Sequence, residues 1–258
     1  MVVGHAVIVV SGRARVNLRV PAGSYTLAVV SLTRLPDPRA RSRFRRHLLR
    51  WYGRHRRDLP WRRTADPYRI LVSEIMLQQT QVERVVPKYH EFLDRYPTLE
   101  ALAGATPADV RRLWYPLGYN VRPLHLRGIA REAVARYDGR LPDDEGALRD
   151  LRGIGRYTAG ALLCFAYGRP VPIVDTNVRR VLGRVFLGPR RLGRLRGQKA
   201  MWDLAGALLP RRRSYDYNQA LMDFGATWCT ARAPRCRPCP MKRFCVAYRT
   251  DGRIRERA

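Results

Sequence analysis

Hydrophobic residues recur at helical spacing through most of the chain after residue 41. Apolar positions three and four residues apart lie on one face of a helix, and two stretches show this pattern over more than two turns. The two predicted faces are Val82, Val85, Val86, Tyr89, Phe92 and Leu93, and Leu126, Ile129, Ala130, Ala133, Val134 and Tyr137. We therefore expect the body of the protein to be mostly α-helical.

Two short segments carry the signals of a helix start. Thr106 is followed by Pro107, which combines a capping hydroxyl with a proline in the first turn. Pro142-Asp143-Asp144 has a similar composition and precedes Leu151. These segments predict helices that begin near 107 and near 145.

Residues 1–36 differ from the rest of the chain because they contain no acidic residue. Two pieces, His5 to Val10 and Tyr25 to Leu32, have the composition of strands and are separated by Gly, Pro and Arg. We expect a basic N-terminal extension, either a disordered arm or the product of a misassigned start, and we assign no chemistry to it.

The 258 residues include 50 Lys and Arg against 21 Asp and Glu, a formal net charge of +29. Such an excess predicts a polyanionic partner, with nucleic acid as the first candidate. Codon bias is the alternative explanation, because only Lys88, Lys199 and Lys242 are lysines. No apolar run approaches the roughly 18 residues of a membrane helix, and no secretory signal is recognisable, so we expect a cytoplasmic, nucleoid-associated protein without membrane contact.

A turn that contains two glycines joins two helical stretches near residue 153. Gly153 and Gly155 bracket Ile154, so the backbone can adopt positive φ and bare N–H groups can approach a phosphate at the start of the next helix. Ile154 would anchor the turn in the core. The pattern fits a helix-hairpin-helix motif, although an ordinary interhelical turn has the same glycines.

Four of the five cysteines are concentrated near the C-terminal end, as Cys229, Cys236, Cys239 and Cys245. Four thiolates in one loop can bind a zinc ion or an iron–sulfur cluster. Structural zinc more often uses two CxxC pairs and only one is present, so the spacing favours the cluster while zinc stays open. The fifth, Cys164, lies in an apolar helical run and is expected in the core.

Two isolated carboxylates occur in apolar segments. Glu74 follows Ile70-Leu71-Val72-Ser73, and Asp175 follows Val171-Pro172-Ile173-Val174. A buried charge is costly unless it is paired or used, so each is a candidate functional group. Asp175 also suits a plain capping role for the helix that follows it.

Taken in order, these features resemble the helix-hairpin-helix DNA glycosylases that carry an iron–sulfur cluster, specifically the MutY-type adenine glycosylases. The resemblance covers about residues 41–248. It rests, beside the hairpin and the four cysteines, on Leu59-Pro60-Trp61-Arg62, Ser73-Glu74-Ile75-Met76-Leu77-Gln78-Gln79-Thr80-Gln81-Val82, Leu117-Gly118-Tyr119, Val174-Asp175-Thr176-Asn177-Val178 and Asn218-Gln219-Ala220-Leu221-Met222-Asp223.

The resemblance implies an all-α, two-lobed fold. Residues 37–65 and 176–250 would form an iron–sulfur cluster lobe, and 66–175 a six-helix barrel lobe with the helix-hairpin-helix at 148–165. The four cysteines would bind a [4Fe–4S] cluster. The partner would be double-stranded DNA with a mismatched or damaged base pair, bound by a monomer.

The resemblance also assigns roles to single residues. Glu74 would protonate adenine while the glycosidic bond breaks, and Asp175 would stabilise the cationic sugar, with Tyr157 and Asn177 beside them. The target nucleotide must leave the base stack for this chemistry. The base-pocket and DNA-binding positions would be Trp61, Arg62, Gln78, Gln79, Thr80, Tyr119, Gly153, Gly155 and Gln219, of which Gln79 and Tyr119 would insert into the stack.

Tyr157 distinguishes this chain from the bifunctional endonuclease III-type relatives. Those enzymes place a lysine two residues after the second hairpin glycine, and its amine forms a Schiff base that leads to strand cleavage. We therefore expect a hydrolase of N-glycosidic bonds without strong lyase activity at abasic sites.

Three functions stay open at this point. An adenine glycosylase is favoured by Gln219 and by Gln78-Gln79, because thymine or uracil mismatch glycosylases of the superfamily tend to have an apolar residue at position 219. Only 13 residues follow Cys245. We therefore expect the chain to lack the Nudix-like domain with which MutY-type enzymes recognise 8-oxoguanine. This layout also fits the mismatch glycosylases. A non-catalytic DNA-binding module is disfavoured because both carboxylates are present.

Overall fold

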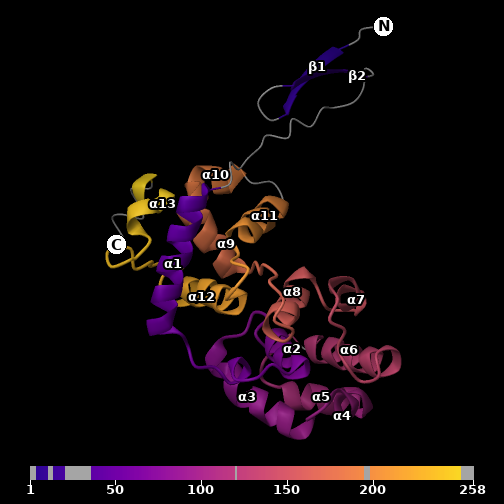
Figure 1. The fold of residues 1–258 in the computed structure, drawn as a ribbon. Helices are drawn as coiled ribbons and strands as arrows, with labels where there is room; N and C mark the ends of the chain where they lie inside the picture. Colours follow the sequence, from indigo (N-terminus) through magenta and orange to yellow (C-terminus); the bar gives the residue numbers. More distant parts are fainter. Residues whose placement is uncertain (1–3, 11–13, 21–35, 120, 195–197, 251–258) are drawn as a thin grey trace. The chain divides into compact units, whose positions relative to one another are not determined.

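The computed structural model describes residues 4–10, 14–20, 36–119, 121–194 and 198–250 (Figure 1). The chain divides into two units, residues 1–34 and 35–258. The described part of the first unit is an antiparallel hairpin of β1 (Gly4–Val10) and β2 (Ala14–Val20). The strand predicted from His5 is confirmed, β2 was not anticipated, and the piece from Tyr25 to Leu32 lies outside the described residues.

In the described part of the second unit every regular element is a helix, which confirms the all-α prediction for the body of the protein. The first group of helices is α1 (Pro38–His55), the short 3-10 helix η1 (Pro60–Arg62), α2 (Pro67–Met76), α3 (Val82–Arg95), α4 (Leu99–Gly104), α5 (Pro107–Trp114), α6 (Arg122–Arg136), α7 (Glu145–Asp150) and α8 (Arg156–Phe165). The remaining elements are α9 (Thr176–Leu182), the π-helical turn η2 (Gly183–Leu187), α10 (Gly188–Arg194), α11 (Lys199–Leu208), α12 (Ser214–Thr227), the 3-10 helix η3 (Lys242–Phe244) and α13 (Val246–Thr250).

Side-chain caps explain where many of these helices begin. An Asp or Thr side chain accepts a hydrogen bond from a first-turn backbone N–H at six starts, and this satisfies a donor that the helix itself cannot pair. The capping residues are Asp37, Asp66, Thr98, Thr106, Asp144 and Asp175. The predicted starts at Pro107 and before Leu151 are therefore confirmed.

Two hydrophobic cores hold the helices of the second unit. The first contains buried residues between Leu59 and Ile173 and is built from η1 and α2–α8. The second contains buried residues of α1 together with residues between Val178 and Met241, and α1 packs against α12 in it (Figure 1). The chain passes from the first core back to the second at residues 174–177, so Asp175 lies where the two cores meet.

The predicted helical faces are largely buried. Val85, Tyr89, Phe92 and Leu93 of α3 lie in the first core, as do Leu126, Ile129, Ala130 and Ala133 of α6. Val134 is an error of the prediction, because 38% of it is exposed. It follows Ala133 by one residue, so the helix turns its side chain about 100° away from that neighbour.

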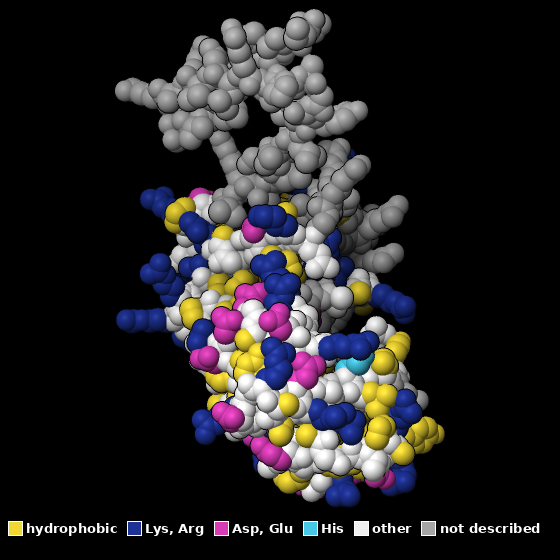
Figure 2. Space-filling view, turned by 90° about the vertical axis from the view of Figure 1, so that its right-hand side faces the viewer, with side chains coloured by type: hydrophobic (Ala, Val, Ile, Leu, Met, Phe, Trp, Pro, Cys, Tyr) yellow, Lys and Arg dark blue, Asp and Glu magenta, His cyan; other side chains and the backbone are white. Residues whose placement is uncertain are grey.

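Charged side chains cover much of the surface. On the face in Figure 2, Lys and Arg side chains project in several places, and a group of acidic side chains lies between them. Charge alone therefore does not mark one binding surface on this face. Among the described helices, none is both long enough and apolar enough to cross a membrane.

Candidate active site

A cavity of about 940 Å³ lies where the two cores meet. Its wall combines η1, α2 and α8 of the first core with α11 and α12 of the second, together with the segments 77–82 and 174–177. Of the residues predicted for catalysis and base binding, it contains Trp61, Arg62, Glu74, Gln78, Gln79, Thr80, Tyr157, Asp175, Asn177 and Gln219. Residues separated by up to about 160 positions thus face one space, while Tyr119, Gly153 and Gly155 lie outside its lining.

Glu74 enters the cavity from α2, a helix that is buried along nearly its whole length. Only 6% of Glu74 is exposed, and this burial raises the pKa of its carboxyl to about 7. Hydrogen bonding by Tyr157 opposes the rise, the charge of Asp175 adds to it, and Arg62 opposes it. A carboxyl with such a pKa can act as a proton donor near neutral pH.

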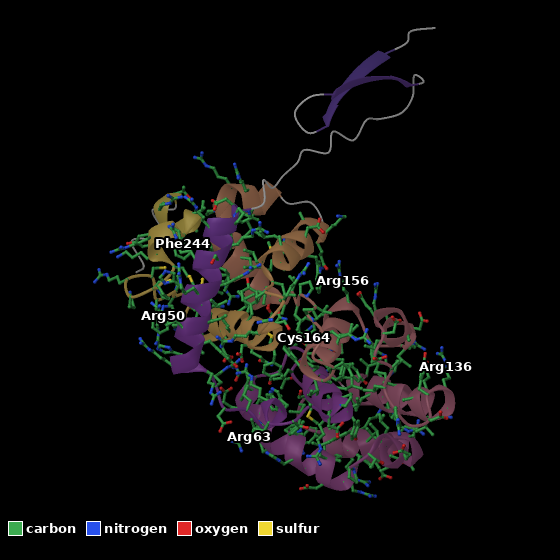
Figure 3. The ribbon with its side chains drawn as sticks, viewed as in Figure 1. Arg50, Arg63, Arg136, Arg156, Cys164 and Phe244 are labelled. Atoms are coloured by element: carbon green, nitrogen blue, oxygen red, sulfur yellow. The ribbon has the colours of Figure 1, made fainter. Side chains whose placement is uncertain are left out.

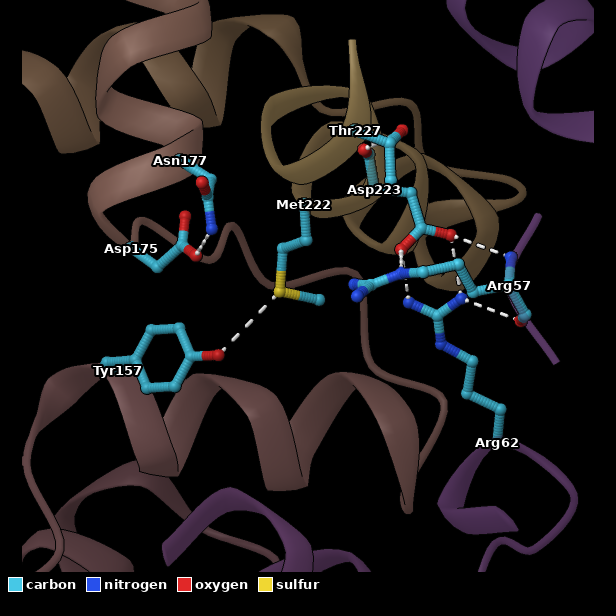
Figure 4. Close-up of polar contacts among 8 residues, drawn as sticks. All are labelled: Arg57, Arg62, Tyr157, Asp175, Asn177, Met222, Asp223 and Thr227. Atoms are coloured by element: carbon cyan, nitrogen blue, oxygen red, sulfur yellow. Dashed lines mark hydrogen bonds and ion pairs between the residues drawn. The ribbon is translucent and has the colours of Figure 1, made fainter. Parts of the chain in front are cut away.

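Tyr157 stands in the first turn of α8, directly after the hairpin glycines. Its hydroxyl donates to Met222 Sδ at 3.6 Å (Figure 4). Burial, together with the negative charges of Glu74 and Asp175, raises the pKa of Tyr157 well above its ordinary value. The side chain is therefore a neutral phenol, and no lysine is among the residues that line the cavity.

Asp175 caps α9 through one carboxylate oxygen, and a second hydrogen bond holds its other oxygen. Its Oδ1 accepts a hydrogen bond from the Val178 N–H at 2.6 Å, and its Oδ2 accepts one from Asn177 Nδ2 at 3.0 Å (Figure 4). The Oδ1 of Asn177 in turn accepts from Arg180 Nη2 at 2.7 Å, and Arg180 Nε donates to the carbonyl of Cys229 at 2.9 Å. The capping interpretation is correct, and the same geometry points this carboxylate at the cavity.

Arg62 is fixed by an acidic residue, Asp223, that the sequence analysis named only as part of a motif and gave no role. Its two terminal nitrogens donate to both oxygens of Asp223, each at 2.8 Å, and Arg57 Nε donates to the same carboxylate at 2.7 Å (Figure 4). Burial alone would raise the pKa of the Asp223 carboxyl, but the hydrogen bonds and charge of Arg62 and the charge of Arg57 bring it below its usual range. Arg62 therefore forms part of the cavity wall with both terminal nitrogens engaged, while its buried Nε has no hydrogen-bond partner among the described residues.

Other walls of the cavity come from aromatic and amide side chains. Trp61 is buried against the edge of Tyr89, with ring centroids 5.4 Å apart. Gln219 of α12 is buried, and none of the hydrogen bonds among described side chains involves its amide, so this group is free to pair with a ligand. Trp202 of α11 also lines the cavity, although the sequence analysis did not predict it. The guanidinium carbon of Arg156, near the start of α8 in Figure 3, lies 4.1 Å from the centroid of the Trp202 ring.

The hairpin turn uses its two glycines differently. Gly153 has φ +108°, and an added Cβ would lie 3.2 Å from the Cβ of His125, so any side chain there would be strained and crowded. Gly155 has φ −88° and caps α8, and nothing lies within 4 Å of an added Cβ. The expectation of positive φ thus holds for Gly153 only. Ile154 is buried and anchors the turn, as predicted.

The four cysteines of the C-terminal loop lie between α12 and α13. Arg184 Nη1 approaches Cys229 Sγ at 3.5 Å, and the Met241 N–H donates to Cys239 Sγ at 3.4 Å. Burial raises the pKa of the Cys239 thiol to about 12, and the other three thiols contribute to this rise, so all four lie within electrostatic range of one another.

Within the described residues no three His, Cys, Asp or Glu side chains converge closely enough to bind one metal ion. Four thiols gathered in one loop, with an N–H and a guanidinium directed at two of them, are donors of the kind that a zinc ion or an iron–sulfur cluster takes. Cys164 is a separate case, because only 1% of it is exposed and it lies in the first core, as expected.

Comparison with known proteins gives the site its family context. Residues 72–204 match the model of the HhH-GPD superfamily base excision DNA repair proteins. The adenine DNA glycosylase of Mycolicibacterium smegmatis is 47% identical over 196 residues, which are 75% of this chain and 66% of that relative. The thymine/uracil-DNA glycosylase of Pyrobaculum aerophilum is 36% identical over 218 residues, which are 83% of this chain and 95% of that relative.

The solved structure of a thermostable thymine-DNA glycosylase superposes with a TM-score of 0.77 at 36% identity, covering 81% of this chain and 96% of that one. The present chain thus spans about two thirds of the adenine DNA glycosylase and nearly all of the thymine/uracil- and thymine-DNA glycosylases. The family model covers half of the chain, and the fold and the hairpin agree with it. The chain belongs to the HhH-GPD superfamily of base excision DNA repair proteins.

Proposed function

We propose that this protein is a monofunctional DNA glycosylase of base excision repair. It removes an adenine mispaired with 8-oxoguanine or guanine from double-stranded DNA and leaves an abasic site. The observation that carries this proposal is the presence in one cavity of two carboxylates in different surroundings: Glu74 is buried, with its pKa raised to about 7, and Asp175 is held by two N–H donors.

The two carboxylates can divide the reaction between them. With a pKa of about 7, roughly half of Glu74 is protonated at neutral pH, so it can donate its proton to a ring nitrogen of adenine. The N-glycosidic bond then breaks, its electron pair leaves with the base, and the positive charge that develops on the sugar is stabilised by Asp175. Water then adds to the sugar carbon and loses one proton, which can return to the Glu74 carboxylate, and this completes hydrolysis.

The cavity is large enough to receive a base that has left the stack. Trp61 supplies an aromatic wall, and the free amide of Gln219 can both donate to and accept from the edge of adenine. Tyr157 closes the wall beside Glu74 with a phenol that cannot form an imine, which supports hydrolysis without strand cleavage.

We also propose that Cys229, Cys236, Cys239 and Cys245 hold a [4Fe–4S] cluster. The fit rests on the four thiols in one loop and on the donors that Arg184 and Met241 direct at two sulfurs. When bound, such a cluster would connect residues 229–245 into one rigid loop. Arg235, Arg237, Lys242 and Arg243 belong to this loop and would then face the DNA backbone from fixed positions.

A thymine or uracil mismatch glycosylase is the second candidate. It is favoured by the extent of the match to the thymine-specific relatives, 95% and 96% of whose length this chain covers. The adenine assignment is favoured by the higher identity of 47% and by Gln219.

The deciding experiment is a single-turnover excision assay on duplexes that contain A·8-oxoG, A·G, T·G or U·G. We expect adenine to be removed from both adenine mismatches. Faster release of thymine from T·G than of adenine from either mismatch would overturn the assignment. Gln219→Leu should shift the ratio of the two rates toward thymine, because an apolar side chain accommodates the thymine methyl group.

A further inference from the structure

Arg122, the first residue of α6, lies buried between two loops of the first core. One loop, residues 77–81, joins α2 to α3, and the other, residues 115–121, joins α5 to α6. Only 6% of Arg122 is exposed. Neither its burial nor its position was evident from the sequence pattern.

The guanidinium of Arg122 donates to acceptors on both sides. Nη1 donates to the carbonyls of Ile75 and Met76, at 3.1 and 3.0 Å, and to that of Gln78. Nη2 donates to Thr80 Oγ1 at 3.1 Å and to the carbonyls of Leu117 and Gly118, at 3.1 and 3.0 Å. One side chain thus connects the first loop with the second.

These bonds surround two residues with unusual backbone conformations. Gln79 has φ +57° and Tyr119 has φ +50°, in the left-handed region that side chains other than glycine seldom occupy. Such conformations persist where the surrounding structure determines them from several sides. The acceptors at 78 and 80 flank Gln79, those at 117 and 118 precede Tyr119, and the guanidinium carbon lies 5.3 Å from the Tyr119 ring centroid.

Arg122 differs from Arg62, the buried arginine of the cavity wall, because it has no described carboxylate as a counter-charge. Arg62 is neutralised by Asp223, whereas no described carboxylate forms an ion pair with Arg122, whose partners are carbonyl and hydroxyl oxygens. A buried charge without a counter-ion is costly, so its retention calls for a specific use. Four of the six acceptors lie in the two loops, at residues 78, 80, 117 and 118, and the other two end α2, so Arg122 joins the two loops to each other and to α2.

The tips of the two loops carry the side chains that must reach DNA under the proposed function. Gln79 is exposed, as is 59% of Tyr119. We propose that Arg122 is a positioning residue that fixes Gln79 and Tyr119 as one unit, so that both side chains enter the duplex together when the target base leaves the stack. This inference rests on the proposed function, because it concerns how a base reaches the cavity.

Helix α2, which carries Glu74, receives two of the six bonds, at the carbonyls of Ile75 and Met76 in its last turn, but its own buried side chains also hold it in place. Ile70, Leu71, Val72, Ile75 and Met76 anchor α2 in the first core. Loss of Arg122 should therefore impair entry of the base and leave the carboxylates in place.

The test compares Arg122→Met and Arg122→Lys with the control Arg127→Met. Arg127 lies on the same helix and donates to the carbonyl of Ala105, away from both loops. Lysine keeps the positive charge but lacks the planar fork, so it cannot serve acceptors on both loops at once. Two readouts are measured: excision from a matched pair of substrates, one with the target base in a duplex and one with it in an unpaired bubble, and the fluorescence of 2-aminopurine placed beside the mismatch.

We expect both Arg122 variants to lower excision from the duplex at least about tenfold more than excision from the bubble, and to suppress the fluorescence rise that reports unstacking. Thr80→Val should show a smaller loss of the same kind, and Thr80→Ser should restore it because the acceptor is kept. Arg127→Met should keep the wild-type ratio and the fluorescence rise.

Equal losses on duplex and bubble, with an unchanged fluorescence rise, would show that Arg122 only stabilises the fold. A wild-type protein that unstacks and excises thymine in place of adenine would refute the adenine assignment, while the duplex-to-bubble ratio would still decide the role of Arg122. If Arg122→Lys kept the wild-type ratio of duplex to bubble excision and the wild-type fluorescence rise, the positive charge alone would be required. That result would overturn the proposal.

Discussion

The side-chain amide of Asn177 donates a hydrogen bond to Oδ2 of Asp175 at 3.0 Å, on the side of the carboxylate opposite the capping bond from Val178. Each oxygen of Asp175 therefore has one donor within its own chain segment. Because both donors lie within three residues of Asp175, the orientation of the carboxylate is set locally, at the point where the two cores meet.

Replacement of Asp175 by Asn separates its chemical role from its capping role. Asn caps helices about as well as Asp, so Asp175→Asn should leave the stability of α9 nearly unchanged. We expect excision to fall by orders of magnitude, because the negative charge that stabilises the cationic sugar is gone. Single-turnover kinetics and a DNA-binding titration would check this. Excision at the wild-type rate by the variant would show that Asp175 only caps α9.

The raised pKa of Glu74 predicts two effects of pH. A general acid must be protonated, so excision should slow as the pH rises above about 7. Since the pKa in the folded state exceeds the ordinary value of 4.5, the contribution of Glu74 to stability is present below pH 4.5 and is lost as the pH rises to about 7.

Glu74→Gln removes this titration and provides the check. It should lower excision by about 100-fold or more and should abolish the decline of the excision rate above pH 7. The free energy of unfolding of the variant, measured in denaturant between pH 4.5 and 7, should vary less than that of the wild type. An unchanged pH profile of either quantity would mean that another group titrates.

The ion pair between Arg62 and Asp223 should be important for stability. Asp223 is fully buried, so Asp223→Asn leaves the guanidinium of Arg62 without its counter-charge inside the protein. We expect a loss of about 3 to 5 kcal/mol in the free energy of unfolding. Asp58→Asn is the matched control, because its pair with Arg63 is exposed and its loss should leave the denaturation midpoint unchanged.

The neutral phenol at position 157 predicts that excision leaves an intact strand until alkali or heat is applied. Borohydride should trap no stoichiometric protein–DNA adduct on the timescale of excision. Rapid trapping would contradict hydrolysis by water. Slow trapping would have to come from Lys88, Lys199 or Lys242, of which Lys88 and Lys199 already pair with Glu91 and Asp203.

The cysteine loop predicts protein that is yellow-brown, with about four iron and four sulfide per chain. Cys239→Ser should lower the iron content and the visible absorbance, because one of the four ligands is lost. Anaerobically prepared protein with one zinc and no iron would refute the cluster. Because the metal content is measured independently of excision, a negative result would not bear on the glycosylase assignment.

The sequence pattern predicted those features that depend on near neighbours along the chain. The cap at Thr106, the buried face of α3 and the anchoring of Ile154 follow from local spacing. Asp223 was missed as a structural residue because its partners Arg57 and Arg62 lie more than 160 positions away. Arg122 was missed because four of its six acceptors lie more than 40 positions away and most of the six are backbone carbonyls, which have no sequence signature. The joint occurrence of the motifs identified the carboxylates, and only the fold showed that they share a cavity.

The burial of Cys164 makes its thiol a reporter of global unfolding. It lies in the first core, where Asn218 Nδ2 approaches its sulfur at 3.3 Å, and burial raises its pKa. An alkylating reagent can therefore reach it only when the core opens, whereas the four loop cysteines are partly exposed. Mass spectrometry of protein alkylated along a denaturant series would thus separate opening of the cysteine loop from loss of the helical core.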